Sequence, residues 1–126
     1  MILVDTSVWI NHLRIGQPTL VRLLEAGLVL GHPWVVGELA LGRLAQRHEI
    51  IELLEGLPQA TVATDAEVMT LVNRHELYGV GIGYVDAQLL AATRLTADAA
   101  LWTADRRLEA AAVRVGSAIH PEIQVP

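Results

Sequence analysis

Short apolar runs that alternate with helix-like segments constrain this chain more than any other feature. Ile2–Leu3–Val4 is a β-branched run that ends at Asp5, Leu28–Val29–Leu30 lies between two glycines, and Ala100 to Thr103 forms a third run. Runs of this length bounded by turn residues are typical of buried strands. Because helical patterns separate them, the sequence favours an α/β fold with a parallel sheet.

Capping residues and the spacing of apolar residues predict the helices. Thr64 to Glu67 is a capping box, and Pro33 suits the first turn of a helix. Two further strands are expected, a brief one at Ala60 to Val62 and a weak edge strand near Ile123 to Val125. The first expected helix begins after Asp5. The other expected helices span Thr19 to Glu25, Trp34 to Arg43, Arg43 to Leu54, Thr64 to about Tyr78, Tyr84 to Thr93, and Asp105 to Arg114.

Composition bounds the chemistry. The 126 residues fit one domain over 1–126, and a hydrophobic content of 52% can form a core. The absence of cysteine excludes disulfides and thiolate metal sites, and the absence of lysine excludes a P-loop or Schiff-base lysine. There is no positively charged start of a secretory signal, and no apolar run approaches the roughly 20 residues that span a bilayer. We therefore expect a cytoplasmic protein without a membrane segment.

Two aspartates follow predicted strands and precede predicted helices. Asp5 ends the first strand, and Asp105 follows the strand that begins at Ala100. Ligands of open α/β sheets bind beyond the carboxyl ends of the strands, so both carboxylates should share one edge. Asp98 precedes the same strand and is expected at the far edge. The alternative is that Asp5 and Asp105 only cap their helices.

Two further acids occupy helices. Glu38 is surrounded by apolar residues, and its neighbours Trp34, Val35 and Leu41 predict that it shares a buried face. An isolated buried carboxylate is costly unless it has a partner, which is an arginine in the structural alternative. Asp86 lies in the first turn of its helix after a glycine-rich stretch, where the helix dipole alone could explain it.

Together these four acids predict a metal site. Close carboxylates repel, and without lysine only arginine, protonation or a metal can neutralise them. Oxygen ligands suit Mg²⁺, or Mn²⁺ as a substitute, and such ions promote attack on phosphodiesters. A net charge of −5 argues against nucleic-acid binding, but bound cations can reverse the local potential.

The ordered motifs resemble a PIN domain. Met1-Ile-Leu-Val-Asp-Thr-Ser-Val-Trp-Ile is similar to the family's first strand with its Asp-x-Ser/Thr ending. Glu38 matches the helical glutamate, Asp86 the third acid, and Leu101-Trp-Thr-Ala-Asp105 the strand that delivers the fourth. Many relatives have an aromatic residue after the fourth acid, where this chain has Arg106-Arg107-Leu108, and we interpret the leucine as repacking.

The resemblance implies a three-layer α/β/α fold with a short, mainly parallel sheet of four to five strands. A free-standing PIN domain of this length looks like a VapC-type toxin, a magnesium-dependent endoribonuclease that cleaves structured RNA such as tRNA or rRNA. It also implies a homodimer and inhibition by a VapB-type antitoxin.

The site hypothesis assigns roles to eight residues. Asp5, Asp86 and Asp105 hold the metal, with Glu38 as a further ligand or as the group that orients the attacking water. Ser7 and Thr103 are candidates for positioning water or phosphate, and helix capping or filling of a strand end is their alternative. Arg106 and Arg107 are candidate contacts to RNA phosphates, with a solvated helix turn as the alternative.

Competing functions fit less well. A haloacid-dehalogenase-like phosphatase needs an aspartate where Ser7 stands, and a lysine. Gly79, Gly81 and Gly83 follow a helix instead of a strand, unlike a Rossmann fingerprint. The five histidines show no pair at zinc-ligand spacing. A DNA-directed nuclease and a non-catalytic module that binds RNA or protein remain open.

Overall fold

The computed structural model describes residues 1–119, and this part of the chain contains three strands and seven helices. The predicted strand near Ile123 to Val125 lies outside the described residues. In chain order the elements are β1 (Ile2–Val4), α1 (Thr6–Ile15), α2 (Pro18–Glu25), β2 (Val29–Leu30), α3 (Pro33–Ala40), α4 (Arg47–Glu55), α5 (Asp65–His75), α6 (Tyr84–Leu95), β3 (Ala100–Trp102) and α7 (Arg106–Arg114).

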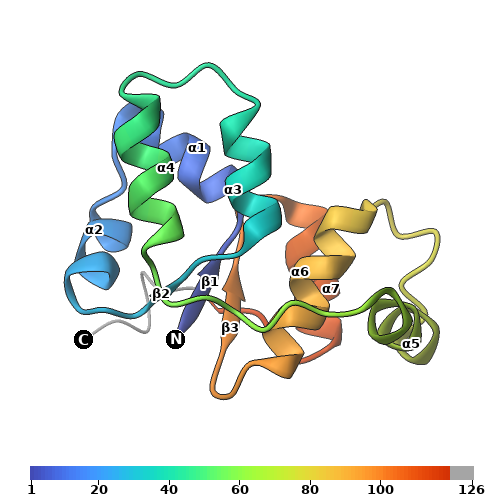
Figure 1. The fold of residues 1–126 in the computed structure, drawn as a ribbon. Coiled ribbons are helices and arrows are strands. Elements are labelled where there is room, and N and C mark those ends of the chain that lie inside the picture. The colour runs from blue at the N-terminus through green and yellow to red at the C-terminus, as the bar shows by residue number, and fades with distance from the viewer. Residues whose placement is uncertain (120–126) are drawn as a thin grey trace.

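The strands form a parallel sheet in the order β2-β1-β3, with the first strand at its centre. Leu3 pairs with Leu30 on one side and with Leu101 on the other, while Val4 pairs with Trp102. Figure 1 shows α2 and α4 on the β2 side of the sheet, and α6 and α7 on the β3 side. The predicted α/β fold with a parallel sheet is therefore confirmed.

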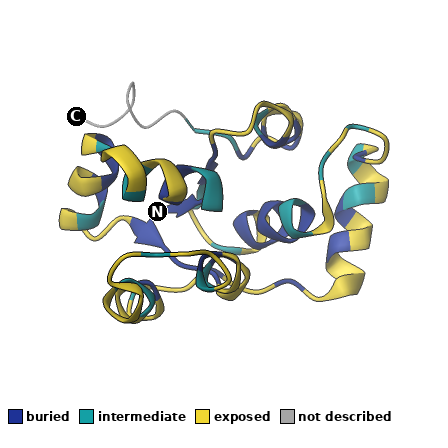
Figure 2. Cartoon of the chain, turned by 90° about the horizontal axis from the view of Figure 1, so that it is seen from above, coloured by how far each residue is buried: buried dark blue, intermediate teal, exposed yellow. Residues whose placement is uncertain are grey.

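The core lies where the helices meet the sheet, and Figure 2 shows the buried segments at the centre of the molecule. Leu3 and Val4 are fully buried from the strand side, and Leu89 of α6 and Leu108 of α7 are fully buried from the helix side. Strands covered on both faces read as continuous apolar runs, which is why these were visible in the sequence.

The sheet is smaller than predicted, because residues 1–119 contain three strands and not four to five. The segment expected as a strand at Ala60 to Val62 makes only an isolated parallel bridge, between Gly31 and Gln59. Two backbone hydrogen bonds, Gly31 N to Pro58 O and Ala60 N to Gly31 O, hold it beside β2. Thr61 then donates to the Thr96 side chain instead of continuing a ladder.

The continuous helix predicted from Arg43 to Leu54 is also wrong at its start. The chain leaves the helical path after α3, and Gln46 adopts a left-handed conformation before α4 begins. The Arg47 guanidinium closes this reversal by donating from Nε and Nη2 to the Ala40 carbonyl, at 3.1 and 3.0 Å. α3 and α4 consequently pack against each other as a helical pair, which a single straight helix could not do.

In residues 1–119 no helix combines the length and apolar character that crossing a membrane requires.

Candidate active site

Asp5 is held at the carboxyl end of β1 by two hydroxyl groups. Its Oδ2 accepts hydrogen bonds from Ser7 Oγ at 2.6 Å and from Thr103 Oγ1 at 2.8 Å. The side chain is only 6% exposed, and it also caps α1 through a longer bond from Ser7 N. A buried carboxylate with charge-assisted hydrogen bonds is fixed in one orientation, so its Oδ1 also has a defined position.

The same two hydroxyls bind the backbone that leads to Asp105. Ser7 Oγ accepts from Ala104 N at 3.0 Å, and Thr103 Oγ1 accepts from Asp105 N at 3.0 Å. Asp5 N donates to Trp102 O, so the carboxyl ends of β1 and β3 are joined by backbone and side chains together. Asp5 and Asp105 therefore lie at one edge of the sheet, as their positions after neighbouring strands predicted.

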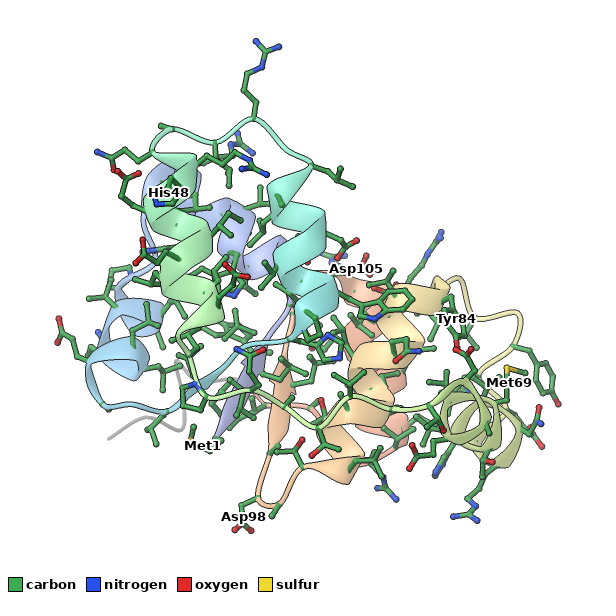
Figure 3. All side chains as sticks on the ribbon, in the orientation of Figure 1. Met1, His48, Met69, Tyr84, Asp98 and Asp105 are labelled. Carbon is green, nitrogen blue, oxygen red and sulfur yellow. The ribbon has the colours of Figure 1, made fainter. Side chains whose placement is uncertain are left out.

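Asp105 caps α7 and is exposed. Its Oδ1 accepts from Arg107 N at 2.9 Å and from Leu108 N at 3.1 Å. Figure 3 shows Asp98 at the bottom of the view and Asp105 well above it, near the middle of the molecule. The Asp98 carbonyl accepts a hydrogen bond from the amine of Met1, the residue before β1. The prediction that Asp98 lies at the far edge is therefore confirmed.

Asp86 faces the other three acids from the first turn of α6. Burial raises the pKa of this carboxyl most strongly, the hydrogen bond from Gly83 N lowers it, and the negative charges of Asp5, Asp105 and Glu38 raise it further. The net effect is a pKa above the usual value for an aspartate. Asp86 thus feels the electrostatic field of all three other acids.

Glu38 reaches the site by a different route from the one predicted. It is exposed, as are Trp34 and Leu41, so this face of α3 is not buried. The buried face of α3 is formed by Val35 and Leu39, because the helix packs on the core along that side only. Glu38 instead accepts a hydrogen bond from Thr6 Oγ1 at 2.7 Å, which ties α3 to the first residue of α1.

Within residues 1–119, each of the four acids is anchored by one oxygen and leaves the other without a protein hydrogen bond. The anchored atoms are Asp5 Oδ2, Asp86 Oδ2, Asp105 Oδ1 and Glu38 Oε1. In the described part of the chain, none of the four forms an ion pair with an arginine. The arginine partner considered for Glu38 is therefore not present.

The donor chemistry of this set fits a hard divalent cation. Four carboxylates with free oxygens and no protein cation offer the ligands that Mg²⁺ takes, and one of them has a raised pKa. Within residues 1–119, however, no three His, Asp or Glu side chains lie close enough to form a ready-made metal group. Like charges separate when no cation lies between them, so small rotations of anchored carboxylates would have to close the site.

The two arginines expected near the site are exposed at the start of α7. The Arg107 side chain lies against the loop before α6, where a Cβ added to Gly81 would be 2.8 Å from Arg107 Cδ. Gly81 has a φ of +86°, which a residue with a side chain rarely adopts. The glycine-rich connector thereby makes room for Arg107 beside the acidic edge.

Two features of the site have no local signature in the sequence. Thr6 bonds to Glu38 across 32 positions of sequence, a contact that only the packing of α1 on α3 creates. Trp34 and Tyr84 pair beside the acids, with ring centroids 6.0 Å apart. An apolar residue on a helix pattern is ordinarily assigned to the core, which is where sequence reasoning placed Trp34.

Comparison with known sequences identifies the family. The PIN domain family matches residues 2–114, a range that includes every element described above. The chain belongs to the PIN-domain family. Two relatives of this PIN domain, both called Ribonuclease VapC32, come from Mycobacterium tuberculosis strains CDC 1551 / Oshkosh and ATCC 25618 / H37Rv. Each is 50% identical over 126 residues, covering 98% of this chain and 99% of the relative.

No solved structure matches this PIN domain. The full-length similarity confirms the predicted resemblance to VapC-type PIN domains and the prediction of a nuclease. The individual roles of the four acids stay predictions, supported by the geometry at the edge of the sheet.

Proposed function

We propose that this PIN domain is a magnesium-dependent endoribonuclease, the toxin of a VapBC-type pair, that cleaves structured RNA such as tRNA or rRNA. The observation that carries the proposal is the set of four carboxylates at one sheet edge, which in the described part of the chain each keep a free oxygen and form no ion pair with arginine. The ribonuclease name of relatives that match nearly the whole chain supports RNA as the substrate.

Asp5, Asp86 and Asp105 would hold the ion through their free oxygens, with Glu38 as a further ligand or as the group that orients the attacking water. Bound Mg²⁺, or Mn²⁺ in its place, supplies positive charge at the reacting phosphate and favours deprotonation of the attacking water. Burial is the main cause of the raised pKa of Asp86, and repulsion from the other three acids adds to it; a bound cation would offset that repulsion, which supports this assignment.

Ser7 and Thr103 position the site for phosphate by holding Asp5 and the backbone of residues 104–105. Arg106 and Arg107 are exposed beside the acids and would contact RNA phosphates flanking the cleaved bond. Positive side chains at the rim are needed because the chain as a whole carries a charge of −5.

A groove of about 450 Å³ whose lining includes Glu38 suits a VapB-type antitoxin. Apolar residues of α1 and of the α3–α4 connection line it, together with Glu38, Arg14 and Arg43. An antitoxin segment seated there could place an arginine among the carboxylates, in competition with metal and phosphate. We further propose that the toxin is a homodimer and that it acts on cytoplasmic RNA.

Two measurements test the enzyme. Added Mg²⁺ should raise the melting temperature of the wild type by binding the folded state, and Asp5→Asn should remove both this rise and RNA cleavage. Asp98→Asn is the matched control, since this acid lies at the opposite edge. RNA cleavage that persists undiminished in Asp5→Asn would contradict the proposal.

The same measurements separate the alternatives. The absence of a ready-made metal group in residues 1–119 favours a non-catalytic module, which would show a melt insensitive to Mg²⁺ and no cleavage. A DNA-directed nuclease would cut a DNA strand of the same sequence faster than the RNA. The carboxylates act on the phosphodiester and do not distinguish the sugars, so only this direct competition decides.

A further inference from the structure

One of the three tryptophans is exposed, and it lies next to the acidic edge. Trp9 and Trp102 are 2% and 5% exposed and belong to the core, whereas Trp34 is 38% exposed. Trp34 precedes Glu38 by four residues on α3, so the two side chains lie on the same face of the helix, one turn apart. Packing of the protein core does not account for the indole ring.

Tyr84 lies beside Trp34 and connects it to the opposite wall of the site. The ring centroids are 6.0 Å apart and the ring planes are inclined by 59°. Tyr84 begins α6, two residues before Asp86, and it is 42% exposed. The aromatic pair therefore bridges α3 and α6, the two helices that carry Glu38 and Asp86.

The protein fixes the Tyr84 ring through its hydroxyl group. Tyr84 Oη donates to Asp65 of α5 and accepts from Gln88 Nε2 at 3.3 Å. Because this hydroxyl is already engaged, the exposed part of the two rings is what the pair offers to a ligand, at little cost in side-chain entropy.

An acidic enzyme that binds a polyanion needs binding energy other than phosphate contacts. Stacking of a base on an aromatic side chain contributes about 1–3 kcal/mol and tolerates any base. RNA loops and bulges expose unpaired bases that proteins bind in this way. We propose that Trp34, set by Tyr84, stacks on an unpaired nucleobase next to the cleaved phosphodiester. This inference rests on the proposed ribonuclease function and adds a base-binding subsite to it.

The test uses tRNA and rRNA, whose loops and bulges contain unpaired bases, so that the cleavage position can be mapped. A second set of RNAs then carries an abasic ribose at one nucleotide on either side of that position. Wild type, Trp34→Ala and Trp34→Phe are compared on both sets for kcat and KM. Leu41→Ala is the matched control, because this exposed leucine is the C-cap of the same helix, beyond Glu38, and has no aromatic ring.

Trp34→Ala should lower kcat/KM on the intact RNA by about tenfold or more, mainly through KM, and Trp34→Phe should restore most of it. At one flanking position the abasic RNA should be cut about as slowly by wild type as by Trp34→Ala, because the stacking is already lost. Leu41→Ala should behave like wild type. Equal losses on intact and abasic RNA, or no loss in Trp34→Ala, would overturn the subsite and assign the ring to a protein interface.

A binding readout separates failure of the subsite from failure of the enzyme. With metal removed by EDTA, the RNA should quench the fluorescence of wild type and not that of Trp34→Phe, whose two remaining tryptophans are buried. Quenching without cleavage on restoring Mg²⁺ would refute the nuclease and retain base stacking. Cleavage with no Trp34-dependent quenching or kinetic effect would refute the subsite and retain the nuclease.

Discussion

The tripeptide Thr-Ala-Asp occurs at both ends of β3, and its two copies have opposite roles. At residues 103–105, Thr103 is buried and bonds to Asp5, and Asp105 caps α7 at the acidic edge. At residues 96–98, Thr96 binds backbone groups of Ala92 and Thr61, and the Asp98 carbonyl accepts from the Met1 amine. Identical residues thus contribute to the candidate site at one end of the strand and to a turn at the other.

The difference shows that the position of an acid along the strand, and not its identity, decides whether it meets other acids. In a parallel sheet the carboxyl ends converge on one edge, so Asp105 follows β3 where Asp5 follows β1. Asp98 precedes β3, and the length of the strand separates it from them. Substitutions made in pairs at the two copies test this directly.

The largest difference is expected between Asp105→Asn and Asp98→Asn. We expect the first to lower RNA cleavage by about a hundredfold or more, because the proposed metal site loses a carboxylate, while asparagine still caps α7. The second should leave cleavage unchanged. Initial rates of RNA cleavage at saturating Mg²⁺ measure both effects. Equal rates for the two variants would contradict the predicted difference between the two ends of β3.

The threonines should differ by a smaller factor. Thr103→Val removes a buried hydroxyl that donates to Asp5 and accepts from Asp105 N, so we expect about tenfold slower cleavage and a loss of ~1–3 kcal/mol in unfolding free energy. Thr96→Val should also destabilise, because Thr61 N loses its acceptor, but cleavage per folded molecule should be normal. Unfolding in denaturant measures the stability of both variants, and initial rates measure their cleavage. Slower cleavage per folded molecule in Thr96→Val would contradict the prediction.

The raised pKa of Asp86 predicts that the stability of the metal-free protein, measured in EDTA, depends on pH. Its raised pKa means that the folded state keeps the proton to higher pH than the unfolded chain does. Unfolding free energy should therefore fall as pH rises from about 4 through the folded pKa, and Asp86→Asn should lack this decrease. The variant should be more stable than wild type at neutral pH, with the advantage vanishing in acid. Asp98→Asn should track the wild type throughout, and an identical trend in Asp86→Asn would contradict the assigned cause.

The smallest effect is expected from glycine at the two aspartates. Asp98 has a φ of 56°, so Asp98→Gly relieves a left-handed backbone and should change the unfolding free energy by less than about 1 kcal/mol, in the stabilising direction. Asp105→Gly should instead destabilise, because two backbone N–H groups lose their acceptor. Thermal melts in EDTA measure both, and the reverse order would show that the turn depends on the Asp98 side chain.

Sequence patterns located Asp5 and Asp105 because burial on both faces of a strand leaves a continuous apolar run with a visible end. They predicted the start of α5 from its capping box, which the structure contains. They failed where tertiary packing decided: the reversal at Gln46, the single bridge at Gln59 and the exposed face of α3. Glu38 was selected for a burial that it does not have, and its contact with Thr6 has no local signature.

The sequence by itself determined the strand–helix alternation, the edge that carries Asp5 and Asp105, and the absence of lysine or cysteine to serve other chemistry. These properties depend on local spacing and residue type. Only the tertiary structure decided that Glu38 and Asp86 face that edge, that one oxygen of each acid stays free, and that Trp34 is exposed beside Tyr84. Such features depend on how helices distant in sequence pack on one sheet, which periodicity does not encode.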